Sequence, residues 1–442
     1  MTTRRRIIGI WGCVSLHLML AVGATQAQSS TPCQAVLDYA DNGHQVNYGP
    51  GRVRQFASGN VRAHCDGQET FMSADSVAWM QDIGQFEMVG RALFRDTTVT
   101  LNADRTVYFL SDERLEAYGN VRLVNVKTGT VLTGPNLTYW RRVPALRDTT
   151  KLYATNRPTV EYTPPQDSSD AEPYIIIGDE IRLVGEAAAW SGGNVRIDRS
   201  DFHSESDSAQ LNLASHVGEL FGNAAVRGGD GDGGGGGGAT GDAADTAGFH
   251  LRGHEIAFAS VNNELSWVQA QDSAEAVSAD FVITADTVEL SLRGGRIQGG
   301  LAWGDLTRSQ VVSATNTITA DSIAIDSPDQ ELQELRGFGS ARATSAPDSL
   351  DGEVDWIAGD TLVARFEESG LQRRFLERLT AIGNAAAFYR VYRPEGGDVP
   401  DINYSRGDHI TALFGLGGLL QVDVIGNADG VHLESVGRGH QP

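Results

Sequence analysis

The sequence is poor in proline, cysteine, lysine and aromatic residues, and it has no long apolar run after residue 24. Its 442 residues include 13 Pro and 3 Cys, the aromatic share is 7%, and Lys127 and Lys151 are the only lysines. The lack of long apolar runs excludes a chain that crosses a membrane many times as helices. The scarcity of proline excludes a collagen-like fibre despite 52 Gly, and a hydrophobic share of 40% excludes a wholly disordered chain.

The charge of the chain is strongly negative. Its 57 acidic residues outnumber 35 basic ones, which gives a formal net charge of −22. A surface of this charge repels nucleic-acid phosphates, so we predict no nucleic-acid partner. The same charge would leave phosphorylated lipid headgroups in solvent.

The first residues have the layout of a secretory signal. Arg4, Arg5 and Arg6 precede an apolar run over residues 7–24, and small residues follow up to Ala27. We predict a signal peptide over residues 1–27 and export of the mature chain to an oxidising compartment. The alternative is an uncleaved anchor helix, because 18 apolar residues are close to the shortest run that spans a bilayer.

Two cysteines remain after the predicted leader. In an oxidising compartment Cys33 and Cys65 are candidates for a disulfide. The bond would close a loop of about 33 residues and contribute about 3 to 4 kcal/mol by restricting the unfolded chain. Two free thiols are the alternative.

A short phrase recurs about ten times: a small residue, usually Asp, a polar residue, and then large apolar residues at alternate positions. Its copies are Ala74-Asp75, Ala103-Asp104, Gly134-Pro135, Gly178-Asp179, Ser206-Asp207, Gly253-His254, Ala285-Asp286, Ala320-Asp321, Gly359-Asp360 and Gly407-Asp408. Alternation with a period of two residues predicts strands with one buried and one solvated face. We expect each Asp at a corner of the sheet, where its carboxylate accepts nearby backbone N–H groups.

A second phrase alternates with the first and has a Gly, often followed by Asn, between apolar residues. It occurs at Gly59-Asn60, Gly119-Asn120, Gly193-Asn194, Gly222-Asn223, Gly383-Asn384 and Gly426-Asn427, and in weaker form at Gly90 and Gly339. A Gly within a strand pattern indicates a bulge or a bend. Each repeat is therefore expected to be a bent hairpin.

Together the two phrases predict an all-β chain, with the form of an elongated open β-jellyroll or β-solenoid of about ten stacked hairpin repeats. We expect two lobes of the same repeat, over residues 28–227 and 248–442. The glycine-rich stretch at 228–247 would be a flexible loop or linker. A weak helical pattern is confined to residues 366–379.

Two segments carry a family resemblance, FMSADSVAW at residues 71–79 and GNVRL at residues 119–123. They resemble the OstA-like family, which includes LptA and the N-terminal domain of LptD. The resemblance is clearest over residues 50–230 and extends weakly to about residue 430. It implies an open β-jellyroll in the periplasm whose apolar interior holds the acyl chains of lipopolysaccharide and whose ends join other subunits edge to edge.

The inward-facing residues of the first lobe are the candidates for a lipid-binding groove. They are Val77, Trp79, Phe86, Met88, Phe94, Tyr108, Leu115, Val121, Leu123, Leu137, Tyr139, Ile181, Leu183, Val195 and Ile197. For each of them, packing in a closed hydrophobic core is the alternative. The sequence leaves open whether the interior is a groove or a core.

Enzyme and metal-binding patterns are weak. The repeated Asp residues occur singly, and His250 and His254 would lie about 13 Å apart on a strand, too far to share a zinc ion. No phosphate-binding loop and no Gly-x-Ser-x-Gly motif is present. We therefore predict a protein without catalysis, cofactor or metal.

Together with these patterns, the resemblance implies a periplasmic lipid carrier or bridge that is associated with the inner or the outer membrane. Its partners would be lipopolysaccharide or a related lipid, together with other lipopolysaccharide-transport proteins or further copies of itself paired edge to edge. The alternative is a structural β-repeat protein of the cell envelope that binds no ligand.

Overall fold

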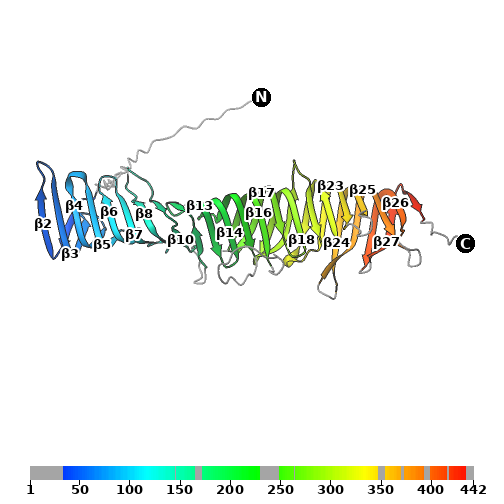
Figure 1. Cartoon of the computed structure of the whole chain (residues 1–442), viewed down its shortest axis with the longest axis horizontal. Helices are drawn as coiled ribbons and strands as arrows, with labels where there is room; N and C mark the ends of the chain where they lie inside the picture. The colour runs from blue at the N-terminus through cyan, green and yellow to red at the C-terminus, as the bar shows by residue number, and fades with distance from the viewer. Residues whose placement is uncertain are drawn as a thin grey trace, which may run out of the picture. The chain divides into compact units, whose positions relative to one another are not determined.

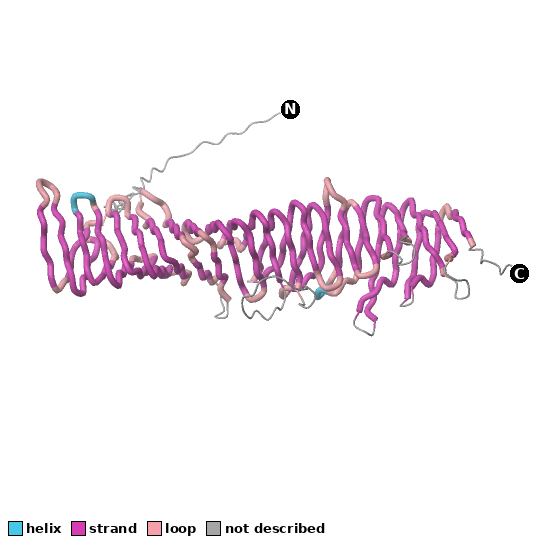
Figure 2. Tube along the Cα trace, viewed as in Figure 1, coloured by secondary structure: helices cyan, strands magenta, loops and turns pink. Residues whose placement is uncertain are grey.

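Strands dominate the computed structural model of this chain, which describes residues 33–144, 146–164, 172–228, 248–262, 264–346, 354–369, 373–392, 399–415 and 418–434. The predicted all-β class is confirmed (Figure 2). The helical segments among these residues are two single 3₁₀ turns, Gln81–Ile83 and Pro328–Gln330. Neither is long enough to cross a membrane. The predicted signal peptide and residues 229–247 of the glycine-rich stretch lie outside the described residues.

Long strands alternate in direction along the chain and pair with their neighbours in sequence (Figure 1). They are β3 (Val53–Cys65), β4 (Phe71–Met80), β5 (Gln85–Arg95), β6 (Val99–Phe109), β7 (Arg114–Asn125), β8 (Val131–Trp140), β13 (Ala188–Arg199), β14 (Phe202–Asn212), β15 (Val217–Gly228), β16 (Phe249–Val261), β17 (Glu264–Val277), β18 (Phe281–Arg293), β23 (Glu334–Ser345), β24 (Trp356–Ser369), β25 (Arg373–Val391) and β26 (Asp401–Gly415). Direct pairing of β15 with β16 continues the sheet on both sides of residues 229–247.

Twelve short strands form six pairs, and each pair takes the place of one long strand. They are β1 (Ala35–Tyr39), β2 (Asn42–Asn47), β9 (Lys151–Thr155), β10 (Thr159–Tyr162), β11 (Tyr174–Ile177), β12 (Glu180–Val184), β19 (Arg296–Trp303), β20 (Ser309–Ser313), β21 (Asn316–Ala320), β22 (Ser322–Asp326), β27 (Gly418–Ile425) and β28 (Asp429–Leu433). For example, the first half of β8 pairs with β10 and its second half pairs with β9. Each long strand thus contributes its two halves to two different layers of strands.

The corner between the two halves is built by the two sequence phrases together. The Asp phrase lies on strands of one direction, and the Gly-Asn phrase lies on the next strand, which runs in the opposite direction. At Gly119 and Asn120 the φ angles are +73° and +45°, and the register with β6 shifts there. This confirms the predicted bulge, because two residues with positive φ bend the strand without changing which face its later side chains occupy.

The corner carboxylate is held by a side-chain amide. At six corners the Asn of the bulge donates its Nδ2 hydrogen to the Asp of the preceding strand, over 2.8 to 3.2 Å. The expected backbone donors occur at Asp286, which accepts the N–H groups of Leu306 and Thr307 at 2.7 and 3.2 Å. Hydrogen bonds from the Thr307 side chain and these backbone groups lower the pKa of Asp286.

One hydrophobic core follows the described chain from Cys33 to Ile410. Its members come from alternate positions of each strand, as in β5, where Phe86, Met88, Ala92 and Phe94 are buried. Both halves of each long strand contribute to this core, so the two layers face each other across it. Residues 32–442 form one compact unit.

The helical pattern predicted over residues 366–379 is wrong. Residues up to Ser369 belong to β24 and residues from Arg373 belong to β25, and the two strands pair with each other. Leu376 and Leu379 are buried in the core, and Phe366 packs against it. Strand pairing and burial therefore override the local helical preference.

Two glycines with the same backbone angle allow the corner to be tested. Gly119 has a φ of +73°, and a Cβ there would overlap the Asp104 carboxylate, whereas Gly129 has a φ of +72° and open space around it. We expect Gly129→Ala to lower the free energy of unfolding by about 1 kcal/mol through backbone strain alone. Gly119→Ala should cost about 1 to 3 kcal/mol more because the carboxylate is displaced. Urea unfolding of both variants measures the difference, and equal losses would contradict this account of the corner.

Candidate functional site

The interior between the two layers is the candidate site, and the ends of the bent strands border it. Rim 1 is defined by strand ends such as Cys65, Phe71, Arg95 and Val99, and rim 2 by ends such as Phe109. Because each strand bends at its corner, its two ends return to opposite sides of one opening. Contacts between the rims therefore decide where the interior is accessible.

The predicted groove residues meet in this interior. Fourteen of the fifteen are buried, and Trp79 is half-buried against the same core. They pack on one another, since the ring of Phe94 meets the rings of Tyr108 and Tyr139 edge to face, with centroids 5.5 and 6.3 Å apart. In this part of the chain the side chains fill the interior.

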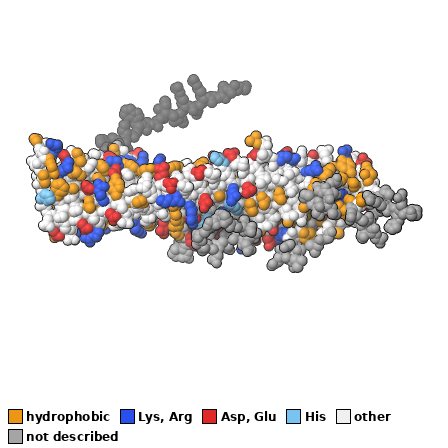
Figure 3. Space-filling view, in the orientation of Figure 1, with side chains coloured by type: hydrophobic (Ala, Val, Ile, Leu, Met, Phe, Trp, Pro, Cys, Tyr) orange, Lys and Arg blue, Asp and Glu red, His pale blue; other side chains and the backbone are white. Residues whose placement is uncertain are grey.

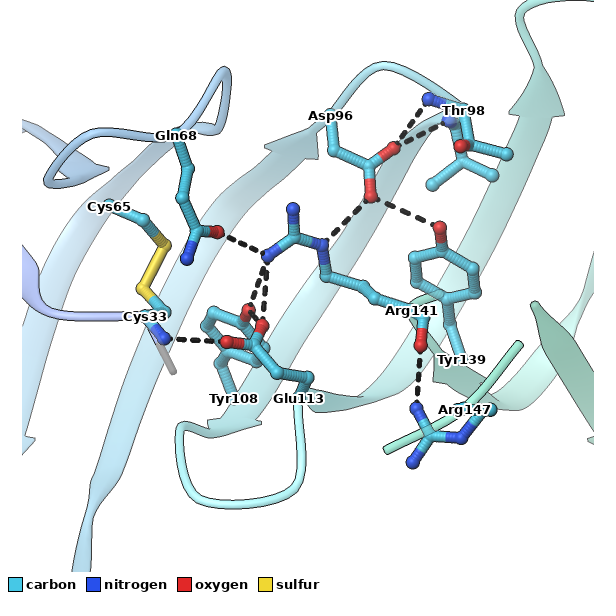
Figure 4. Close-up of polar contacts among 11 residues, drawn as sticks. Cys33, Cys65, Gln68, Asp96, Thr98, Tyr108, Glu113, Tyr139, Arg141 and Arg147 are labelled. Atoms are coloured by element: carbon cyan, nitrogen blue, oxygen red, sulfur yellow. Dashed lines mark hydrogen bonds and ion pairs between the residues drawn. A yellow bond between two sulfur atoms is a disulfide. The ribbon is translucent and has the colours of Figure 1, made fainter. Parts of the chain in front are cut away.

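A buried ionic cluster next to these packed side chains connects rim 1 to rim 2 (Figure 4). Arg141 on rim 2 donates from Nε to Asp96 on rim 1 at 3.1 Å and from Nη1 to Gln68 on rim 1 at 2.9 Å. Its Nη1 also donates to Glu113 on its own rim at 2.8 Å. The side chains of Asp96 and Glu113 are 4% and 2% exposed, so this pair of carboxylates depends on Arg141 for charge compensation.

Two tyrosines and the disulfide complete the cluster. Tyr139 donates to Asp96 at 3.0 Å, and Tyr108 donates to Glu113. Burial raises the pKa of both phenols far above the usual range, so both remain protonated donors. Cys33 is bonded to Cys65, and its backbone N–H reaches across the rims to Glu113 at 2.5 Å. The disulfide thereby holds a donor of rim 1 against an acceptor of rim 2.

A second set of contacts joins the rims further along the chain. Tyr174 on rim 1 exchanges a hydrogen bond with Ser260 on rim 2 at 3.0 Å, and it accepts one from Arg199. Asp201, the ion-pair partner of Arg199, accepts the backbone N–H of Leu265 on rim 2 at 3.1 Å. Burial raises the pKa of Tyr174, which keeps its hydroxyl neutral. The rims are therefore closed at two separate places by buried polar groups.

Toward the C-terminal end, the described polar contacts run along a single rim more often than from one rim to the other. Gln330 on rim 2 still donates to the Gly248 carbonyl on rim 1 at 3.0 Å. From β23 onward, ion pairs such as Arg390 with Asp355 and Arg374 with Glu331 stay within one rim.

A cavity of about 180 Å³ lies in this region, and we name it the C-terminal cavity. It extends from rim 1 to residues near rim 2, and its apolar lining includes Ile357, Leu379, Ala387, Ile410, Ala412 and Val422.

A second cavity of about 370 Å³ lies at the other end of the sheet, between β1 and β2. Trp79, Phe86 and Phe56 line it together with the polar side chains of His44 and Gln55. Figure 3 shows hydrophobic side chains at the surface of this end. Three of the predicted groove residues, Val77, Trp79 and Phe86, thus border open space, while those deeper in the first lobe border other side chains.

Sequence reasoning missed the cluster around Arg141 and the C-terminal cavity. Asp96, Glu113 and Arg141 lie in turns and at a strand end, far apart in sequence and outside the repeated phrases. The signal that was available is an acidic or basic residue directly beside a strand end, and many surface turns share it. Within the described residues, no group of three or more His, Cys, Asp or Glu side chains could hold a metal ion.

Comparison with known proteins adds no assignment. No protein-family model matches the chain, and no curated protein matches its sequence.

Substitution of Arg141 tests whether this arginine compensates the charges of the buried carboxylates in the rim cluster. Arg141→Met removes the charge between two buried carboxylates, and we expect it to lower the free energy of unfolding by about 3 to 5 kcal/mol. The exposed Arg122 on β7 is the matched control, and Arg122→Met should change stability by about 0.5 kcal/mol or less. Denaturant unfolding of both variants measures the effect. Similar losses for the two would refute the role of Arg141 as the charge partner.

Proposed function

We propose that this chain is a periplasmic lipid-binding protein of the lipopolysaccharide-transport type. In this proposal the two layers of bent strands form an open β-jellyroll, and acyl chains bind between them. The observation that carries the proposal is the C-terminal cavity, an apolar space that reaches from one rim to the other. The resemblance to the OstA-like family supports the same assignment.

The energetics favour acyl chains as the ligand. Each CH₂ group removed from water contributes about 0.8 kcal/mol, so a short length of chain binds without a charged contact. Apolar side chains such as Ile357 and Val422 border the cavity and offer such an environment. The fifteen groove residues of the first lobe stay a prediction, and lipid would have to displace their mutual packing to enter there.

The end strands support the proposed contacts with other subunits. At one end β1 and β2 pair with β3, and at the other end β27 and β28 pair with β26. In the described part of the chain these four strands have a partner on one side, and the backbone of the other side is free to pair. Leu420 and Ile425 of β27 are 73% and 63% exposed, which favours a partner that covers this end.

The alternative is a structural repeat protein of the envelope. The packed interior of the first lobe and the buried polar clusters across the rims favour it. Such a protein would use the same strands and corners and would bind no lipid. The two proposals differ in whether the C-terminal cavity is ever occupied.

Filling the cavity separates the two proposals. Ala412 is buried and lines the cavity, so Ala412→Phe should fill part of it. We expect at least a tenfold drop in affinity for lipopolysaccharide, measured by displacement of an apolar fluorescent probe, because several CH₂ contacts are lost. Val431→Phe on the exposed strand β28 is the control and should leave binding unchanged.

Lipid extracted from the purified mature protein gives a second measurement. Wild-type protein that carries no lipid and whose probe is not displaced by lipopolysaccharide would favour the structural alternative. A melting temperature of Ala412→Phe close to that of the wild type shows that lost binding does not come from unfolding.

A further inference from the structure

Three aromatic rings lie side by side on the outer surface near the C-terminal cavity. Trp356 of β24, Phe388 of β25 and Tyr404 of β26 occupy one cross-strand row. The rings of Trp356 and Phe388 are stacked with centroids 6.4 Å apart, and Tyr404 meets Trp356 at 6.3 Å. Their strand neighbours Ile357 and Ala387 are buried, so the three half-buried side chains start on the outer face of the sheet, next to the edge of the cavity that Trp356 and Phe388 help to line. We name these three residues the aromatic platform.

Two arginines flank the platform in the next row. Arg342 pairs across strands with Ala358, which pairs with Ala386, which pairs with Arg406. Three strand spacings separate the arginines, or about 14 Å between their backbones. Between the two arginines lie Ala358 and Ala386, whose methyl groups rise little above the backbone. The row therefore has a cation at each end and a shallow depression between them.

The guanidinium groups of these arginines contact rings. Arg342 lies 4.4 Å from the Trp356 ring centroid, and Arg406 lies 5.3 Å from that of Tyr404 and donates to its hydroxyl at 2.6 Å. No carboxylate of the described residues lies within 4.0 Å of either group. Asp429, the cross-strand neighbour of Arg406, accepts the backbone N–H of Gly430 instead. In a chain of net charge −22, two exposed arginines with no acidic partner among the described residues place positive charge beside the platform.

The platform adjoins the cavity across rim 1. Trp356 is the first residue of β24, and both Trp356 and Phe388 are among the residues that line the C-terminal cavity. A lipid whose acyl chain enters the cavity from rim 1 has its polar end beside the platform. Aromatic faces pack against the C–H surfaces of sugar rings, and arginine binds phosphate through paired hydrogen bonds.

We infer that the aromatic platform, with Arg342 and Arg406, binds the phosphorylated sugar headgroup of the lipid whose acyl chain enters the C-terminal cavity. This inference rests on the proposed function and narrows the substrate class to glycolipids with anionic groups at opposite ends of a short sugar chain. It differs from the expectation that the net charge leaves the headgroup in solvent, because the local charge of the platform is opposite to that of the whole chain.

The test uses the mature full-length protein and three probes. They are the acylated disaccharide anchor of lipopolysaccharide with its phosphates, the same molecule after enzymatic removal of the phosphates, and a long-chain fatty acid. The variant R342Q/R406Q removes both cations from the platform. The control R95Q/R122Q removes two exposed arginines of the first lobe, one of which also lies over a ring, Phe71 at 5.5 Å.

We expect R342Q/R406Q to weaken binding of the phosphorylated anchor by about tenfold or more. Binding of the dephosphorylated anchor and of the fatty acid should stay at the wild-type level, and the control should match the wild type with all three probes. A second variant, Tyr404→Leu, changes a platform residue that does not line the cavity, keeps an apolar side chain in the row, and should weaken both sugar-containing probes while sparing the fatty acid.

Failure of this inference differs from failure of the proposed function. If R342Q/R406Q binds the phosphorylated anchor as well as the wild type, the headgroup site is refuted and the cavity proposal stands. If the wild-type protein binds none of the three probes, the proposed function itself fails, and the inference fails with it.

Discussion

The contact between a corner carboxylate and the Gly-Asn bulge of the next strand is the constraint on which the rest depends. An extended strand cannot fold back over itself without a local break in its ladder. Here the break occurs where two successive residues have positive φ, and the Asn amide donates to the Asp beside it. The glycine leaves room for the carboxylate. The bulged strand keeps the parity of its side chains, and the Asp strand shifts by one residue at the corner, from Ala103 to Thr106 in β6, so both halves of each strand point buried residues into one core.

That geometry brings the two ends of each strand to a common opening, which must be closed or filled. Beyond the cavity at its N-terminal end, aromatic and aliphatic side chains of the first lobe fill this opening. One buried ion pair, Arg141 with Asp96, and buried hydrogen bonds such as that between Tyr174 and Ser260 join the rims. A buried ion pair contributes little net stability compared with apolar packing, but removal of one partner is costly because the other charge stays buried without compensation. The clusters at Arg141 and Arg199 therefore fix how the rims meet. Toward the C-terminal end, the described contacts run along each rim and a cavity lies between them.

The repeated phrases allowed most of this fold to be predicted from the sequence. Alternation gave the strands, and it gave the buried face correctly even across the bulges, as at Leu115, Ala117, Val121 and Leu123. The pairing of the Asp phrase with the Gly-Asn phrase was not predicted, because a hydrogen bond between neighbouring strands has no signature in either phrase alone. The first corner was missed as well. Its Asp41 lies between two short strands, without the alternating residues that mark the other copies.

The candidate site was less predictable than the fold. Inward parity cannot distinguish a side chain that borders a cavity from one that packs against its neighbours, since the difference depends on the volumes of all the side chains around it. The cluster around Arg141 assembles from residues as far apart as Cys33 and Glu113, which are neighbours only after the strands have bent. The lack of an acidic partner for Arg342 and Arg406 among the described residues likewise depends on which side chains lie nearby in space.

Most strands pair with the next strand in sequence, and the others pair with a strand two or three places away, which has a kinetic consequence. Closing a short loop costs little chain entropy, so hairpins can form at several points and extend by adding adjacent strands, as in other repeat architectures. The contacts between distant segments, such as Cys33 with Glu113 and Gly248 with Gln330, can form only after the intervening strands are in register. We therefore expect the chain to fold by pairing of strands close in sequence first, and by formation of the contacts between the rims last.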